Sequence, residues 1–105
     1  MSTPGALDKM DFYILLALAE KPLHGYAISE QITVDSGGSA VIAPTNLYRY
    51  LYRLEDAGMI TPVATSSNLA LKRKSYQLTT AGSRRLKSEA LHLADATELA
   101  AQRLS

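Results

Sequence analysis

Apolar and polar positions alternate along the chain in patterns that predict four helices and one pair of strands. The first helix is predicted over residues 8–20 and contains an unbroken apolar run from Phe12 to Ala19. Such a run also fits a buried strand, but Leu and Ala favour a helix, and Lys21-Pro22 ends it. Because this helix is apolar on nearly every side, it must be buried on more than one side. In so short a chain, that predicts contact with a second subunit as well as with the chain's own core.

The clearest amphipathic pattern lies between Pro44, which suits a first helical turn, and Gly58, which suits a helix end. At about 100° per residue, one narrow stripe carries Leu47, Leu51 and Leu54. The opposite arc carries hydrogen-bonding and cationic side chains, flanked by aromatic rings: Thr45, Asn46, Arg49, Tyr52 and Arg53, with Tyr48 and Tyr50 at the flanks. A helix that is merely soluble would more often carry mixed Glu and Lys on that arc.

A shorter helix is predicted just before this one. It opens at His24-Gly25-Tyr26 and runs to about Val34, with Tyr26, Ile28 and Ile32 as its apolar anchors. His24 stands where the helix begins, which favours a capping or packing role over metal binding or catalysis.

Two strands are predicted after Gly58, over Met59–Val63 and Lys74–Leu78. The second alternates apolar and polar residues, as a half-buried strand does. Pro62 predicts an edge position for the first strand, because proline cannot donate a ladder hydrogen bond. The polar connection between them makes a long hairpin, whose returning arm begins with Lys72, Arg73 and Lys74.

A long helix closes the chain over residues 81–104, with Thr79 or Thr80 as its cap. At 1.5 Å per residue it is about 36 Å long, which is more than so small a domain can cover. Its apolar and small residues recur at steps of four and three, which is typical of a weak coiled-coil seam. The seam consists of Leu86, Ala90, Leu93, Thr97, Ala100 and Leu104.

This order of elements predicts a mainly α fold with a small β-hairpin. It is the order of a winged helix-turn-helix domain over residues 7–79 and a C-terminal dimerisation helix over residues 80–105, after a disordered tail of residues 1–6. In a helix-turn-helix the second helix of the pair enters the major groove, N-terminal residues first. The helix that starts at Pro44 is therefore the predicted recognition helix, and the hairpin is the predicted wing.

Composition narrows the function. The 105 residues are 47% apolar, which suits one globular domain, and they include two His and no Cys. Without Cys there is no thiolate nucleophile and no Cys-based zinc site. Gly-rich phosphate loops and nucleophile–base sets are also absent from the sequence, so we expect no enzyme activity, metal or cofactor. The sequence contains neither a membrane-spanning apolar run nor a secretory signal, so a cytoplasmic protein away from membranes is expected.

The formal net charge of +1 conceals a strong segregation. Residues 44–87 contain eight Lys and Arg against two acids, a charge of +6, and the rest of the chain carries −5. Such asymmetry is typical of a surface that meets a polyanion, although a solvated basic face that binds nothing has the same composition. Combined with the predicted fold, it indicates double-stranded DNA. Arg bonds guanine, Asn bonds adenine, hydroxyls reach phosphates, and the wing cations attract the DNA backbone. The predicted DNA-binding residues are Thr45, Asn46, Tyr48, Arg49, Tyr52, Arg53, Lys72, Arg73 and Lys74.

Four segments, in order and at matching spacing, resemble the PadR family of bacterial transcriptional regulators in its compact form. They are ILLAL at 14–18, LHGYAI at 23–28, LYRYLYRLE at 47–55 followed by GMI at 58–60, and RKSYQLT at 73–79 followed by Gly82. The family usually has a Gly-Thr step before its Leu-Tyr pair, where this chain has Thr45-Asn46. The loop before Pro44 is also somewhat longer in this chain than in the family. Both departures bear on base contacts, so the operator sequence does not carry over.

The resemblance implies a homodimeric repressor with a near-palindromic operator, in which the first and last helices form the interface. The residues expected there are Phe12, Leu15, Leu86, Ala90, Leu93, Ala100 and Leu104. It also implies a small aromatic or planar effector near that interface. Phe12 and Tyr13 are candidates for its pocket, with plain packing as their alternative role. The chain has no Trp, which argues against a tryptophan sandwich. The alternative is a winged-helix protein-interaction module that does not bind DNA, because one fold serves unrelated functions.

Overall fold

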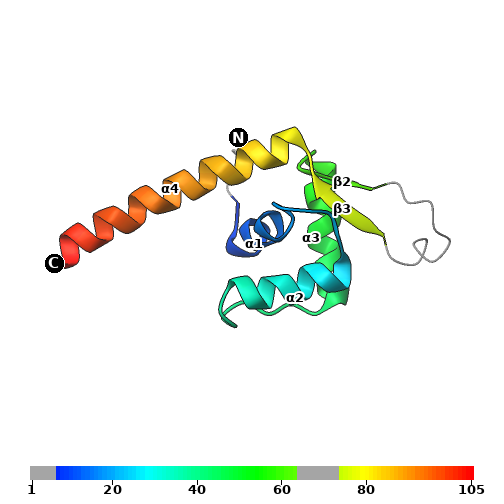
Figure 1. Ribbon diagram of the computed structural model, residues 1–105, viewed down its shortest axis with the longest axis horizontal. Helices are drawn as coiled ribbons and strands as arrows, with labels where there is room; N and C mark the ends of the chain where they lie inside the picture. The colour runs from blue at the N-terminus through cyan, green and yellow to red at the C-terminus, as the bar shows by residue number, and fades with distance from the viewer. Residues whose placement is uncertain (1–6, 64–73) are drawn as a thin grey trace.

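The computed structural model describes residues 7–63 and 74–105 of the chain (Figure 1). In chain order its elements are α1 (Lys9–Ala17), β1 (Leu23–His24), α2 (Gly25–Asp35), α3 (Pro44–Asp56), β2 (Ile60–Pro62), β3 (Ser75–Leu78) and α4 (Thr80–Leu104). Helices α1, α2 and α3 form a cluster, a small sheet lies at one side of it, and α4 begins beside the sheet and runs past α1 (Figure 1). The mainly α winged-helix fold is thus confirmed.

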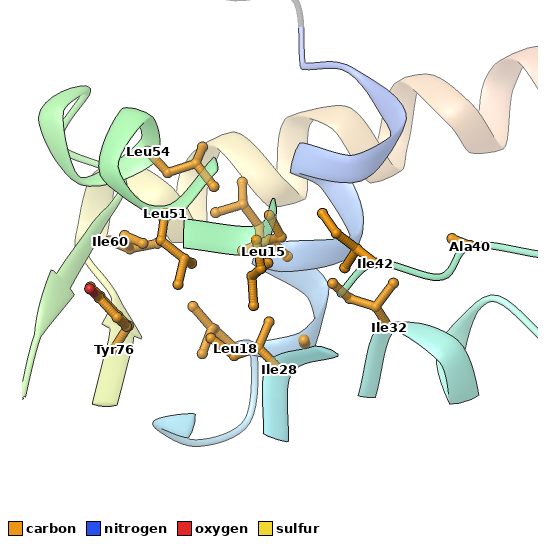
Figure 2. Close-up of a cluster of buried hydrophobic side chains, with 13 residues drawn as sticks. Leu15, Leu18, Ile28, Ile32, Ala40, Ile42, Leu51, Leu54, Ile60 and Tyr76 are labelled. Atoms are coloured by element: carbon orange, nitrogen blue, oxygen red, sulfur yellow. The ribbon is translucent and has the colours of Figure 1, made fainter. Parts of the chain in front are cut away.

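The core lies between the three helices and the sheet. It is built from one face of each element, and the side chains converge as Figure 2 shows. Its members are Ile14, Leu15, Ala17, Leu18, Ile28, Ile32, Ala40, Ile42, Leu47, Leu51, Leu54, Ile60 and Tyr76. The predicted α3 stripe of Leu47, Leu51 and Leu54 is confirmed as core. Since full burial of a Leu or Ile side chain is worth about 1.5–3 kcal/mol, this cluster holds α3 in place and leaves its other face outward.

The sheet has three antiparallel strands in the order β1-β3-β2, so the expected two-stranded hairpin was incomplete. Leu23 pairs with Tyr76 and His24 with Ser75, which adds the short strand β1 to the far side of β3. On the other side, Pro62 lies opposite Tyr76 on β2, which is an edge strand as its proline predicts. The sheet therefore ties the start of α2 to the base of the wing.

Side-chain caps fix three helix starts. The Asp8 carboxylate accepts the Asp11 amide at 2.8 Å at the start of α1, and His24 Nδ1 accepts the Ala27 amide at 3.4 Å at the start of α2. Thr79 Oγ1 accepts the Gly82 amide at 3.0 Å at the start of α4. The capping roles of His24 and Thr79 are thus confirmed. At its other end α1 stops at Ala17, three residues earlier than predicted.

Helix α4 packs on the domain only through its first turns. Gly82 is its one buried residue, and every residue from Ala90 onward is exposed. Leu86 is half-buried against the core cluster. Figure 1 shows the second half of α4 continuing away from the three-helix cluster. In the described part of the chain no helix is long and apolar enough to cross a membrane.

Candidate nucleic-acid interface

The outer face of α3 is a continuous polar surface. All six of the residues predicted for it are exposed: Thr45, Asn46, Tyr48, Arg49, Tyr52 and Arg53. Pro44 stands in the first turn, where its fixed φ suits a helix start. The opposite face is locked by the buried leucine stripe, so the backbone cannot rotate these side chains inward. The fold therefore presents one helix face of hydroxyl, amide and guanidinium groups to the surroundings.

Helices α2 and α3 cross closely at Gly25 and Tyr48. A Cβ added at Gly25 would stand 3.0 Å from the Tyr48 hydroxyl oxygen, so the absence of a side chain lets the ring lie against α2. Ile28 and Ile32 anchor α2 as predicted, but Tyr26 does not, because its side chain is 60% exposed. Tyr26 stands beside this crossing at the start of α2. The apolar pattern had assigned Tyr26 to the core. Its exposed side chain instead adds a hydroxyl group near the predicted DNA-binding site.

Lys74 brings the base of the wing beside α3. Arg49, Tyr52 and Lys74 line one open depression together with Arg53, Glu55 and Asp56. The Lys74 ammonium lies 5.6 Å from the ring centroid of Tyr76, which is buried in the core below it. Burial raises the pKa of the Tyr76 hydroxyl, so this ring stays neutral beside the cation. The structure thus brings Lys74 and the α3 cations together, whereas Lys72 and Arg73 lie outside the described residues.

Arg53 differs from the other exposed residues of α3 because its guanidinium group is bonded to a carboxylate of α1. Its Nη2 donates to Asp11 Oδ1 at 2.8 Å and lies 3.8 Å from Asp8 Oδ2. Its guanidinium carbon is also 4.8 Å from the centroid of the Tyr50 ring. The side chain remains 57% exposed, while the Asp11 side chain is only 9% exposed. Spacing along the chain gave no sign of this contact, since the partners are 42 residues apart.

The predicted interface residues fall into three groups by exposure. Leu15 is fully buried in the chain's own core, so its side chain is not accessible to a second subunit. Phe12 and Leu86 are half-buried, and Ala90, Leu93, Ala100 and Leu104 are exposed on α4. Phe12 and Tyr13 contact each other edge to face, with ring centroids 5.9 Å apart. The exposed group forms an apolar strip along the part of α4 that extends beyond the domain.

A three-helix cluster, a β wing and an exposed polar α3 define a winged helix-turn-helix protein. Residues 14–88 match the sequence profile of the transcriptional regulator PadR-like family, and the chain belongs to that family. Its members and structural neighbours are transcriptional regulators, which are not enzymes.

The chain is also similar to individual known proteins in sequence and in fold. The chain is similar to a transcriptional regulator from Clostridium thermocellum, with 27% identity and a TM-score of 0.70 over 90% of this chain and 92% of the other. It is also similar to Bacillus subtilis PadR in complex with operator DNA, with 28% identity and a TM-score of 0.69 over 79% of this chain and 47% of that one. An uncharacterized 37.1 kDa protein in transposon TN4556 of Streptomyces fradiae is 37% identical over 77% of this chain. The chain spans only 22% of the length of that curated relative.

Proposed function

We propose that this chain is a homodimeric transcriptional repressor that binds a near-palindromic operator through α3 and the wing and responds to a small aromatic or planar effector. The observation that carries the proposal is the outer face of α3. Six polar or aromatic residues are exposed together on a helix whose other face is wholly buried. The charge of +6 over residues 44–87 supplies the attraction to a polyanion.

The proposed contacts divide by chemistry. Arg49 and Asn46, in the N-terminal half of α3, read base edges in the major groove, because Arg pairs with guanine and Asn with adenine. The hydroxyls of Thr45, Tyr48 and Tyr52 bond to phosphates and fix the register. Lys74, with Lys72 and Arg73, attracts the neighbouring backbone without reading sequence. The similarity to Bacillus subtilis PadR, whose structure is in complex with operator DNA, supports DNA binding by this fold.

The dimer and the effector rest on α1 and α4. The apolar strip on α4 is long and exposed, with Leu93 at 42% and Leu104 at 86% of full exposure, and a second copy would cover it. A two-fold axis relating two α3 helices would place half-sites about one helical turn of DNA apart. The half-buried Phe12–Tyr13 pair offers aromatic surface on α1, which packs against α4, for a planar effector.

Binding to the DNA upstream of the chain's own gene tests the proposal. We expect the purified protein to shift that fragment in a gel in the presence of excess competitor DNA, and to protect two half-sites from nuclease cleavage. Affinity should fall steeply as salt increases, because binding releases counterions from phosphates. Binding that competitor DNA abolishes at equal mass would contradict operator recognition, and no DNA binding at all would favour the protein-interaction module.

The dimer is tested by Leu93→Glu. This change places a charge in the exposed apolar strip of α4, far from the core, so the domain should keep its fold. We expect wild-type protein to scatter light as a dimer at micromolar concentration and the variant to scatter as a monomer. Asp95→Ala removes a charge from the exposed polar side of the same helix; it is the control and should stay dimeric. A monomeric wild-type protein would refute the proposed assembly.

A further inference from the structure

One side-chain cluster links α1 to the recognition helix at the C-terminal edge of the surface predicted to bind DNA. Asp8, Asp11, Tyr50 and Arg53 form it, with the guanidinium at its centre. Asp11 receives the close hydrogen bond, at 2.8 Å, and Tyr50 lies against the guanidinium at 4.8 Å. Since Asp8 also caps α1 by accepting the Asp11 amide, the first turn of α1 and the last turn of α3 are held together at one point.

The position of Arg53 along α3 sets it apart from Arg49. Arg53 stands in the last turn of the helix, one turn further from the N-terminal end that leads into the groove. One of its guanidinium N–H groups donates to Asp11, whose side chain is almost fully buried, so moving the whole guanidinium onto DNA would break that bond.

At neutral pH the ion pair offsets only part of the cost of burying the Asp11 carboxylate. Burial raises the pKa of Asp11 above its ordinary value, and the hydrogen bond from Arg53 only partly opposes this, while the same bond raises the pKa of Arg53. A carboxyl group with a raised pKa in the folded chain adds stability at acidic pH, and that addition is lost as the pH rises through the folded-state pKa. At neutral pH the pair still fixes the position of α3 against α1, because it is a short bond to a buried group.

We propose that Arg53 is a positioning residue rather than a DNA contact, and that its bond to Asp11 sets the angle at which α3 meets the operator. This inference rests on the proposed DNA binding and adds a route for control. Asp11 directly precedes Phe12, which lies on the face of α1 assigned to the dimer and effector. A shift of α1 on its partner or effector would therefore reach α3 through this bond.

A double-mutant cycle on operator binding tests the inference. Asp11→Ala and Arg53→Ala should each weaken binding by about tenfold, and the double variant should bind no more weakly than either single variant, because all three lose the same contact. The slope of log affinity against log salt should stay at the wild-type value in every case. Asp11→Asn keeps an oxygen that can accept the Arg53 bond, so it should regain most of the lost affinity and remain folded.

The opposite results identify a direct DNA contact. If Arg53 met a phosphate, Asp11→Ala would free it and remove a negative charge, so binding would tighten or stay unchanged, and Arg53→Ala would lower the salt slope by about one unit. Glu20→Ala is the control for loss of one negative charge, since Glu20 is exposed three residues beyond the end of α1. Arg49→Ala separates the two proposals: if it weakens binding while Asp11→Ala does not, only the positioning role fails. If neither variant changes binding, the assigned α3 interface fails as well.

Discussion

Replacement of Gly82 by Ala is expected to lower the free energy of unfolding by about 3 kcal/mol or more. A Cβ at this position would overlap the Met59 carbonyl oxygen and stand 2.9 Å from its carbonyl carbon. Both are backbone atoms, and the Met59 oxygen also accepts the Thr79 amide at 3.0 Å, so it has no freedom to move aside. Helix α4 would have to lift off the turn before β2, which would open the sheet and displace the wing.

The sign of this effect separates packing from helix propensity. Within a helix, Ala is normally better than Gly by about 1 kcal/mol, so propensity alone predicts that Gly82→Ala stabilises the chain. Chemical denaturation followed by circular dichroism measures the difference. Ser83→Ala is the matched control, because Ser83 is exposed on the same turn and should leave stability within about 0.5 kcal/mol of wild type. A Gly82→Ala variant as stable as wild type would show that α4 does not pack on the Met59 backbone.

Most of the fold could be predicted because local sequence patterns specify it. The leucine stripe of α3 follows the helical period, and the caps at His24 and Thr79 depend on residues three positions away. Gly58 has a φ of +79°, which fits its predicted place after α3, since this backbone conformation favours glycine. The outer arc of α3 then followed from the stripe without further information.

Long-range contacts and uniformly apolar segments could not be predicted in this way. Strand β1 is two residues long and exists only because β3, more than fifty positions later, pairs with it. The Asp11–Arg53 bond likewise joins residues 42 positions apart, so no local pattern indicated it. In α1 nearly every position is apolar, so periodicity gave no reason to place Leu15 in the core instead of the interface. Tyr26 was misplaced for a related reason, because a tyrosine fits a core and a wet surface equally well.

The contrast between Arg49 and Lys74 provides the sharpest test of how operator sequence is read. Both cations are exposed, and they line the same depression beside Tyr52. A planar guanidinium can bond two acceptors of one guanine, whereas an ammonium on a flexible stem acts as a point charge toward phosphate. Although Arg49 and Lys74 carry equal charge and lie close together, they should therefore contribute differently to sequence specificity.

Arg49→Ala is expected to weaken operator binding by about 10- to 100-fold, corresponding to 1–3 kcal/mol for a lost bidentate base contact. The loss should be confined to operator DNA and should shrink when the contacted base pair is changed. Lys74→Ala should weaken binding to operator and unrelated DNA by similar factors and lower the salt slope by about one unit. Fluorescence anisotropy on labelled duplexes, with each half-site position substituted in turn, measures both effects.

If α3 is the recognition helix, Arg49→Ala and Lys74→Ala must differ in how the loss of affinity depends on DNA sequence. If Arg49→Ala lowered affinity evenly across all duplexes, Arg49 would be a phosphate contact, and sequence would have to be read by Asn46 and Thr45 at the start of the helix. If Arg49→Ala left operator binding unchanged, the exposed arc of α3 would not enter the groove at all. Because the buried leucine stripe fixes the rotation of α3 about its axis, Thr45, Asn46 and Tyr52 share that arc with Arg49 and would be removed from the interface with it. One substitution in a helix of 13 residues thus tests the orientation of the whole domain on DNA.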